Sequence, residues 1–116
     1  MLLKVLEQTE ALSQVSFVHE YIQLVFQDYV LNLYNPIWIK QKSYIYNRED
    51  PNFCDAMVSL IGLKVVNVFM VKNEILSLHF ESDISVSASL LPEDAAGPEA
   101  FQFKGPNALL VVEQNT

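Results

Sequence analysis

The chain has 116 residues, of which 51% are apolar and 18% are charged, and its formal net charge is −7. This length fits one domain, and the apolar fraction is enough for a core without disulfides or a structural metal. The negative charge disfavours nucleic acid and anionic membranes as partners, and it favours a basic protein partner.

No membrane span or export signal is expected. The longest uncharged stretch, residues 29–39, is shorter than the run of about 20 apolar residues that a membrane helix needs. Glu7 and Glu10 interrupt the apolar N-terminus, so we expect no signal peptide. The one cysteine, Cys54, excludes an intrachain disulfide. These features favour a cytoplasmic protein.

The first half of the chain alternates apolar and polar residues with a period of two, which predicts a three-stranded antiparallel meander. Its strands are expected at residues 15–20, 21–27 and 29–34. Asn35 and Pro36 end the meander, because proline cannot donate to a ladder. Residues 1–14 fit either a short helix or a strand. Residues 37–39 are expected as a loop or an edge, and residues 43–46 as a strand.

One helix is predicted at residues 51–61. Asp50 is a favoured N-cap, and Pro51 is favoured at the first helical position. Apolar residues follow at helical spacing, namely Phe53, Met57, Leu60 and Ile61. Gly62 is well placed to end the helix.

A second meander follows the helix, with turns at residues 72–74 and 81–83. Its strands are expected at residues 65–71, 75–80 and 84–88. Proline, glycine and acidic residues predict a loop over 91–99. Residues 101–103 and 108–112 are expected as short strands, and the tail at 114–116 is expected to fray.

The two meanders have similar apolar patterns. Residues 15–18 and 22–26 match 68–71 and 76–80, and the third strands also correspond. Every amphipathic meander shares this alternation, so the likeness fits either a duplication or two unrelated meanders. A duplication would imply two similar sheet halves packed around the helix.

The predicted fold is a single α+β domain over residues 1–116, mainly antiparallel β, with two three-stranded meanders, C-terminal strands and one central helix. The sheet is expected to be strongly curved or split in two. The candidate core residues are Phe17, Leu24, Phe26, Leu33, Phe53, Met57, Leu60, Val66, Val68, Leu78, Phe80, Val86 and Val111.

The residue types that usually carry chemistry are sparse. The two histidines, His19 and His79, could in principle bind zinc or act as general acid and base, but no metal-binding spacing accompanies them. Cys54 falls at the start of the predicted helix, where it could act as a nucleophile. The sequence does not indicate a base that would activate it. Free cysteines are more often buried. No glycine-rich phosphate loop is present. We therefore expect no enzymatic activity, no metal and no cofactor.

One locally basic segment combines aromatic and cationic residues. These residues are Tyr34, Trp38, Tyr44 and Tyr46, with Lys40, Lys42 and Arg48. Such a mixture can stack single-stranded nucleic acid. Lysines also protect an edge strand from pairing with other chains, and the net negative charge favours this second interpretation.

The acids are more informative as a group, because seven of them lie between residues 73 and 116 against one base, Lys104. Loops carry function more often than cores do, although charges also gather in loops simply because loops are solvated. The six acids in predicted turns and the long loop form the predicted partner-binding surface. They are Glu74, Glu81, Asp83, Glu93, Asp94 and Glu99.

Several runs resemble a pattern in small bacterial proteins. These runs are Leu60–Val65, Leu76–Glu81, Ser89–Asp94 and Gly97–Ala100, with Tyr21–Phe26 and Leu31–Pro36 in the first half. Some of those proteins look like immunity proteins of toxin–immunity pairs, including contact-dependent growth inhibition systems. The shared motifs are structural, so no functional residue is carried over. The resemblance implies a bacterial protein with an antitoxin-like role.

The leading hypothesis is therefore an immunity protein that binds a basic toxin domain, a nuclease in particular, and occludes its active site. The first alternative is a small β-rich ligand-binding or enzymatic domain with a pocket near His79. A homo-oligomeric structural subunit is a third possibility.

Overall fold

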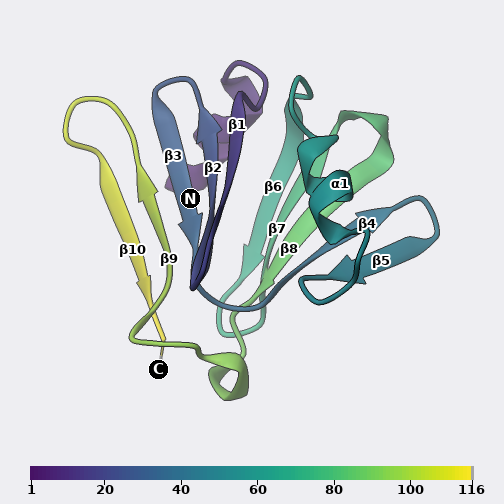
Figure 1. Ribbon diagram of the computed structural model, residues 1–116. Coiled ribbons are helices and arrows are strands. Elements are labelled where there is room, and N and C mark those ends of the chain that lie inside the picture. Colours follow the sequence, from purple (N-terminus) through teal and green to yellow (C-terminus); the bar gives the residue numbers. More distant parts are fainter. Residues whose placement is uncertain (116) are drawn as a thin grey trace.

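The computed structural model describes residues 1–115, and within them ten strands form two five-stranded antiparallel sheets. The sheets face each other across a common apolar core (Figure 1). The first sheet contains, in spatial order, β1 (Gln14–Val18), β2 (Tyr21–Phe26), β3 (Tyr29–Leu33), β9 (Glu99–Lys104) and β10 (Leu110–Gln114). The second contains β5 (Tyr44–Asn47), β4 (Ile37–Gln41), β8 (Ile84–Ser89), β7 (Ile75–Phe80) and β6 (Val65–Val71).

Short helical segments border the sheets. They are the 3-10 segments η1 (Leu2–Gln8), η2 (Glu81–Asp83) and η3 (Pro92–Asp94), and the α-helix α1 (Phe53–Val58). The fold is thus α+β and mainly antiparallel β, as predicted, with the strands split between two sheets. No helix within residues 1–115 has the length and apolar character needed to cross a membrane.

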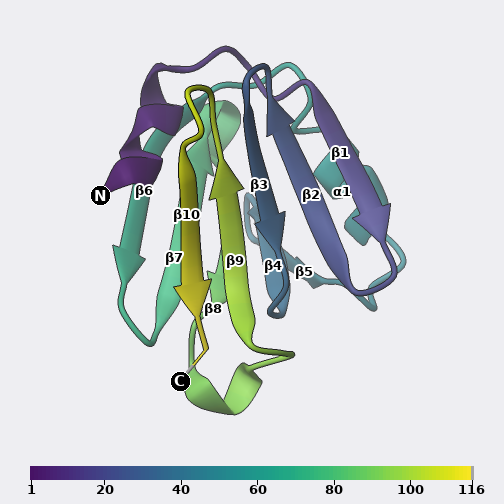
Figure 2. The ribbon, with the colours of Figure 1, turned by 90° about the vertical axis from the view of Figure 1, so that its left-hand side faces the viewer.

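Each predicted meander forms three consecutive strands of a different sheet. β1, β2 and β3 lie in the first sheet, and β6, β7 and β8 lie in the second (Figure 2). The sheets pack directly on each other, with the ring of Phe26 stacked on that of Phe80 at 6.2 Å. The helix α1 is not central. It packs against β4 and β5, and its Phe53 meets Phe17 of β1 edge-on at 6.4 Å.

Most of the predicted core is buried, and three residues differ. Phe17 lies on the edge strand β1 and is 39% exposed. Val66 is 57% exposed, because a β-bulge between Val65 and Asn67 shifts the alternation of β6 and turns Val65 inward. Val111 is half-buried on the edge strand β10, where it packs against the core from one side.

Two local predictions in the middle of the chain were wrong. Residues 37–39, expected as a loop or an edge, belong to the interior strand β4, which is hydrogen-bonded to both β5 and β8. Pro36 precedes this strand, so its missing N–H costs no ladder bond. The helix is also shorter than predicted, ending at Val58, while Gly62 adopts a positive φ of 95° in the turn beyond it.

The predicted cap at Asp50 was wrong as well. The N-cap residue of α1 is Asn52, whose side chain makes no capping hydrogen bond. Asp50 stabilises the preceding loop, because its Oδ2 accepts a hydrogen bond from the backbone N–H of Asn47 at 2.8 Å.

The C-terminal tail does not fray where the structure describes it. Gln114 belongs to β10, and the backbone N–H of Asn115 donates to the carbonyl of Pro98 at 2.9 Å. The closing strand therefore lies two residues later than predicted, at 110–114. The expected fraying of Thr116 lies outside the described residues.

Candidate binding surface

The six predicted acids lie at two opposite ends of the sandwich. Glu74 is in the β6–β7 turn, and its carbonyl accepts a hydrogen bond from the N–H of Leu90, just before η3. Glu93 and Asp94 lie in η3, and Glu99 begins β9. Glu81 and Asp83 lie in η2, at the far ends of β7 and β8. Since β7 has six residues, the two groups are separated by roughly 17 Å at about 3.4 Å per residue.

Two of the six carboxylates are already used inside the fold. Glu81 Oε1 accepts a hydrogen bond from the backbone N–H of Lys64 at 2.8 Å. Asp94 Oδ2 accepts one from Ser89 Oγ at 2.6 Å. These contacts tie a loop to a strand end, so both acids have a structural role whatever else they do.

Two further acids, which the sequence analysis did not select, lie in segments at the end of the sandwich that holds η3 and the β6–β7 turn, the lower end in Figure 1. Glu20 lies in the β1–β2 turn, and Glu49 follows β5. Both come close to the loop after η3, because each lines a hollow together with Ala96. We call this region the acidic end. Its acids are Glu20, Glu49, Glu74, Glu93, Asp94 and Glu99.

An open groove of about 600 Å³ crosses the acidic end. We call it the tyrosine groove, and it is lined by Glu20, Tyr21, Tyr34, Ala96, Gly97, Pro98 and Glu99. The rings of Tyr21 and Tyr34 lie 5.4 Å apart at an interplanar angle of 56°. Both tyrosines lie just beyond Ile22 and Leu33, which form the last cross-strand pair of the β2–β3 ladder at this end. The groove is therefore bordered by the two tyrosine rings and by the carboxylates of Glu20 and Glu99.

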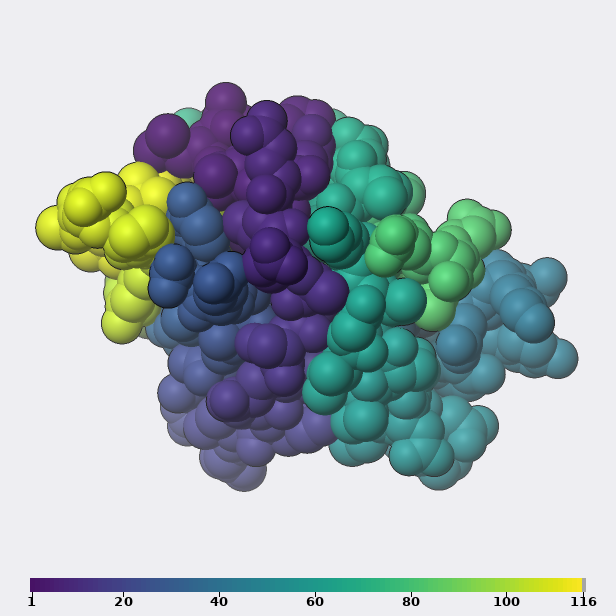
Figure 3. Space-filling model, turned by 90° about the horizontal axis from the view of Figure 1, so that it is seen from above, coloured from purple at the N-terminus to yellow at the C-terminus, as the bar shows by residue number. Residues whose placement is uncertain are grey.

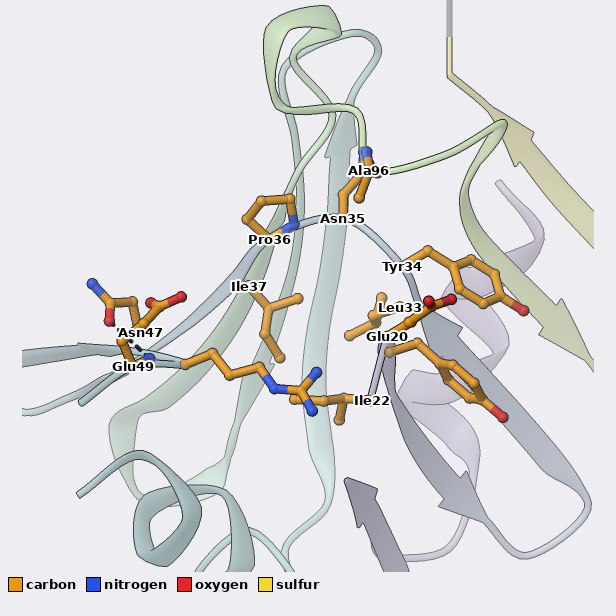
Figure 4. A pocket seen from close by; sticks show the side chains of 12 residues that line it. Glu20, Ile22, Leu33, Tyr34, Asn35, Pro36, Ile37, Asn47, Glu49 and Ala96 are labelled. Carbon is orange, nitrogen blue, oxygen red and sulfur yellow. Dashed lines mark hydrogen bonds between the residues drawn. The ribbon is translucent and has the colours of Figure 1, made fainter. Parts of the chain in front are cut away.

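A smaller cavity of about 230 Å³ adjoins the groove and shares Glu20, Tyr21, Tyr34 and Ala96 with it. It lies between the ends of the two sheets. In Figure 4, Glu20 and Tyr34 lie on one side of this cavity, and Asn47 and Glu49 lie on the other. Its lining also includes buried apolar residues, namely Ile22, Leu33 and Ile37.

The carboxylates around these hollows form no ion pair within residues 1–115. The ion pair found there joins Lys4 and Glu7, far from the groove, at 2.9 Å. Arg48 lines the smaller cavity, but its guanidinium donates to the backbone carbonyl of Val18 at 2.5 Å. Glu20, Glu49 and Glu99 therefore form no ion pair within residues 1–115, while the positive charge of Arg48 lies in the same cavity as Glu20 and Glu49.

The pKa of the Tyr34 hydroxyl reflects the electrostatic environment of the groove. Burial raises the pKa of its hydroxyl above the ordinary value of 10.0, and the charges of Glu99 and Tyr21 raise it further. A hydrogen bond with Asn32 acts in the opposite direction. The hydroxyl is therefore neutral at physiological pH, and the negative charge of Glu99 acts on it electrostatically.

A buried asparagine fixes the loop that borders the groove. Asn35 Nδ2 donates to the carbonyl of Ser89 at 3.0 Å, and its Oδ1 accepts from the N–H of Ala96 at 3.3 Å. Asn115 bonds to both polar atoms of the Asn35 amide and donates to the carbonyl of Gly97 at 2.7 Å. The groove wall at 96–98 is thus held from both sides.

The residues considered for catalysis lie apart. His19 is exposed in the β1–β2 turn, whereas His79 lies on β7 with its ring stacked on that of Phe69 at 5.6 Å. Cys54 is in the first turn of α1 and is exposed, where burial was expected. Within residues 1–115, no group of three or more His, Cys, Asp or Glu side chains is placed to hold a metal ion.

A hollow of about 480 Å³ does lie beside His79, at the opposite end from the tyrosine groove. Its polar lining comes from β4, the β4–β5 turn, β7, β8 and η2, and it mixes both signs of charge. The polar side chains are those of Lys40, Lys42, His79, Glu81, Ser82, Asp83 and Ser85.

The aromatic and basic segment does not form one platform. Trp38 and Lys40 lie on one face of the β4–β5 hairpin, because they pair with Asn47 and Ile45 across the ladder. Tyr44 and Tyr46 stack on each other at 6.2 Å on the other face. Successive bases of a nucleic acid could not stack on both faces at once.

The end opposite the acidic end is shown in Figure 3, where the N-terminal residues lie between the β9–β10 hairpin and the β4–β5 hairpin. It carries exposed acids of its own, among them Glu10, Asp28 and Asp83. Glu10 and Asp28 border a hollow of about 270 Å³, whose lining includes Phe26 and one tyrosine, Tyr29, but no pair of tyrosines. This end therefore offers acids comparable in exposure but not in surroundings.

Comparison with known proteins places the chain in no group: no family model, no curated protein and no solved structure matches it.

Proposed function

We propose that this chain is an immunity-type protein, which binds a basic protein toxin through its acidic end and thereby blocks the toxin's active site. The observation that supports the proposal is the gathering of unpaired carboxylates around an aromatic groove, on loops contributed by both sheets. A surface of this kind suits a partner rich in lysine and arginine.

The acidic end is complementary in charge to a nuclease active site. An enzyme that cleaves nucleic acid lines its active site with cations that bind phosphates. Carboxylates at the acidic end can occupy those cations in place of the phosphates. Opposite charges also speed the encounter, and such association reaches about 10⁸ M⁻¹s⁻¹ or more at low salt.

The proposal gives the chain no catalytic step of its own. His19 lies in the β1–β2 turn of the first sheet, whereas His79 lies on β7 of the second sheet. Cys54 is on α1, outside both the groove and the hollow beside His79. The toxin would be a nuclease acting in the cytoplasm, where the immunity protein would meet it.

The test uses the protein encoded next to this chain in its genome. That protein is co-expressed with and without the chain, growth is followed, and the affinity of the purified pair is measured at two salt concentrations. We expect growth protection, a defined complex, and weaker binding at the higher salt concentration as the Debye length shortens. A neighbour that neither binds the chain nor becomes harmless in its presence would overturn the proposal.

A small-ligand or enzymatic site beside His79 is the second candidate, favoured by the hollow found there. The variant His79→Gln separates the two, with His19→Gln and Cys54→Ser as parallel controls. We expect all three variants to protect cells like the parent. Loss of protection by His79→Gln alone, with an unchanged circular dichroism spectrum, would favour the second candidate.

A further inference from the structure

We infer that the tyrosine groove receives an arginine side chain of the partner, with its guanidinium against Tyr21 and Tyr34 and within reach of Glu20 and Glu99. This inference rests on the proposed function and adds to it the chemical group that is recognised and the residues that recognise it.

The aromatic pair supports a cationic occupant. The faces of aromatic rings carry negative electrostatic potential and attract cations within about 6 Å. The rings of Tyr21 and Tyr34 are 5.4 Å apart and tilted by 56°, so they present two differently oriented surfaces to the same hollow. The hydroxyl of Tyr34 stays neutral, because its pKa is raised above 10.0, mainly by burial.

The carboxylates specify the sign of the occupant's charge. Glu20 and Glu99 line the groove together with the two rings, and neither forms an ion pair within residues 1–115. Glu99 is half-buried, so its charge is less screened by solvent than that of a fully exposed acid. A cation placed here would meet both aromatic faces and negative charge.

The third wall suits the stem of a long side chain. Ala96, Gly97 and Pro98 are small or apolar, and they leave room for methylene groups. Arginine buries such a stem while its head remains polar. The wall is held in place by hydrogen bonds from Asn115 to the carbonyls of Gly97 and Pro98, so little ordering is needed on binding.

Arginine fits this combination better than lysine does. Its planar guanidinium stacks on aromatic rings and offers a fork of donors to carboxylates. A lysine ammonium is a compact, strongly hydrated charge and uses neither feature fully. The groove therefore selects arginine among the basic residues of a partner.

The experiment titrates the full chain with a blocked peptide that contains a single arginine, followed by nuclear magnetic resonance. Two further peptides replace arginine by citrulline, its neutral isostere, or by lysine. We expect saturable shifts at Tyr21, Tyr34 and residues 96–99 with the arginine peptide, weaker ones with lysine and none with citrulline. Equal shifts with citrulline, or shifts confined to another surface, would refute the inference. Equal binding of lysine would refute its selectivity.

A matched pair of variants locates the contact. Glu99→Gln and Glu93→Gln remove the same charge from the same end, but only Glu99 lines the groove. We expect the arginine peptide to bind Glu99→Gln about tenfold more weakly, as for a lost charge-assisted contact, and to bind Glu93→Gln like the parent. Tyr34→Phe keeps the ring and should retain binding, whereas Tyr34→Leu should lose it. Equal losses in the two glutamate variants would overturn the assignment.

The outcomes also separate this inference from the proposed function. A basic neighbour that binds and is neutralised, while the peptide does not bind, would remove the groove assignment alone. Peptide binding without any bound neighbour would leave the groove as an arginine site and remove the immunity proposal.

Discussion

The two ends of the sandwich carry similar acids in different surroundings. At the end with η2, Glu81 is bonded to a backbone N–H and its neighbours include the lysines Lys40 and Lys42. At the acidic end, Glu20 and Glu99 border two tyrosine rings and form no ion pair within residues 1–115, although Arg48 lines the cavity next to Glu20. The contacts of an acid, and not the number of charges along the chain, therefore separate a structural acid from one that is available to a partner.

The largest expected effect is a charge reversal in the groove. Glu99→Lys should weaken the complex with a basic partner by about 30-fold or more, or about 2 kcal/mol, since a repulsive charge replaces an attractive one at a half-buried position. Calorimetric titration measures the change. Asp83→Lys, at the other end, is the control and should change the affinity little. Similar losses in both variants would remove the distinction between the two ends.

The next effect concerns the scaffold of the acidic end. Asn35→Ala should lower the free energy of unfolding by about 2–3 kcal/mol, because a buried side chain with several hydrogen bonds is removed and Ser89 O is left unpaired. Denaturant titration gives the value. Asn115→Ala should have a smaller effect, since Asn115 is less buried. An unchanged midpoint for Asn35→Ala would contradict the hydrogen-bond network.

A smaller effect on stability is expected at the other end. Glu81→Ala removes the acceptor for the N–H of Lys64 and should cost about 1 kcal/mol, without weakening the binding of a basic partner. Glu74→Ala is the matched control, because Glu74 is an exposed acid in a comparable turn. If Glu81→Ala is as stable as Glu74→Ala, the bond to Lys64 contributes nothing.

The smallest effect is a change in titration. In the folded protein the pKa of Tyr34 lies above its ordinary value of 10.0, chiefly because of burial and secondly because of Glu99. The neutral Tyr34 hydroxyl thus contributes to the stability of the fold. This contribution is fully present below the pKa that Tyr34 has in the unfolded chain, and it is lost as the pH rises through its pKa in the folded protein. Glu99→Gln should lower the pKa of Tyr34 only in part, as followed by its ring resonances. If the pKa of Tyr34 is unchanged in Glu99→Gln, the carboxylate of Glu99 does not act on the Tyr34 hydroxyl.

The sequence predicted the architecture well wherever the alternation was regular. Both meanders formed within a few residues of their expected bounds, because period-two burial and short polar turns determine the register. Prediction failed where a neighbour decides the outcome. The strand β4 is interior only because β5 and β8 flank it, and Asp50 serves a loop because Asn47 is within reach.

The candidate surface was predicted only in part. Glu74, Glu93, Asp94 and Glu99 are at one end, but their sequence positions gave no sign that Glu81 and Asp83 are at the other. The tyrosine pair could have been found from the turn alone. A two-residue turn at 27–28 pairs Phe26 with Tyr29, and continuing this register brings Tyr21 level with Tyr34. Glu49 needed the packing of the two sheets, which no local pattern reports.

Binding of the basic partner at the acidic end can be tested with two matched triple variants. One combines Glu20→Gln, Glu49→Gln and Glu99→Gln around the groove and its cavity. The other combines Glu10→Gln, Asp28→Asn and Asp83→Asn among exposed acids at the opposite end. Both remove three negative charges, so the general attraction of the chain for a basic protein falls equally.

The affinity of the basic neighbour for the two triple variants and the parent is measured in one buffer at physiological salt. We predict a loss of at least about 100-fold for the variant at the acidic end, and less than about threefold for the opposite end. Equal losses in the two variants would show that net charge alone drives the association, and a larger loss at the opposite end would contradict the account.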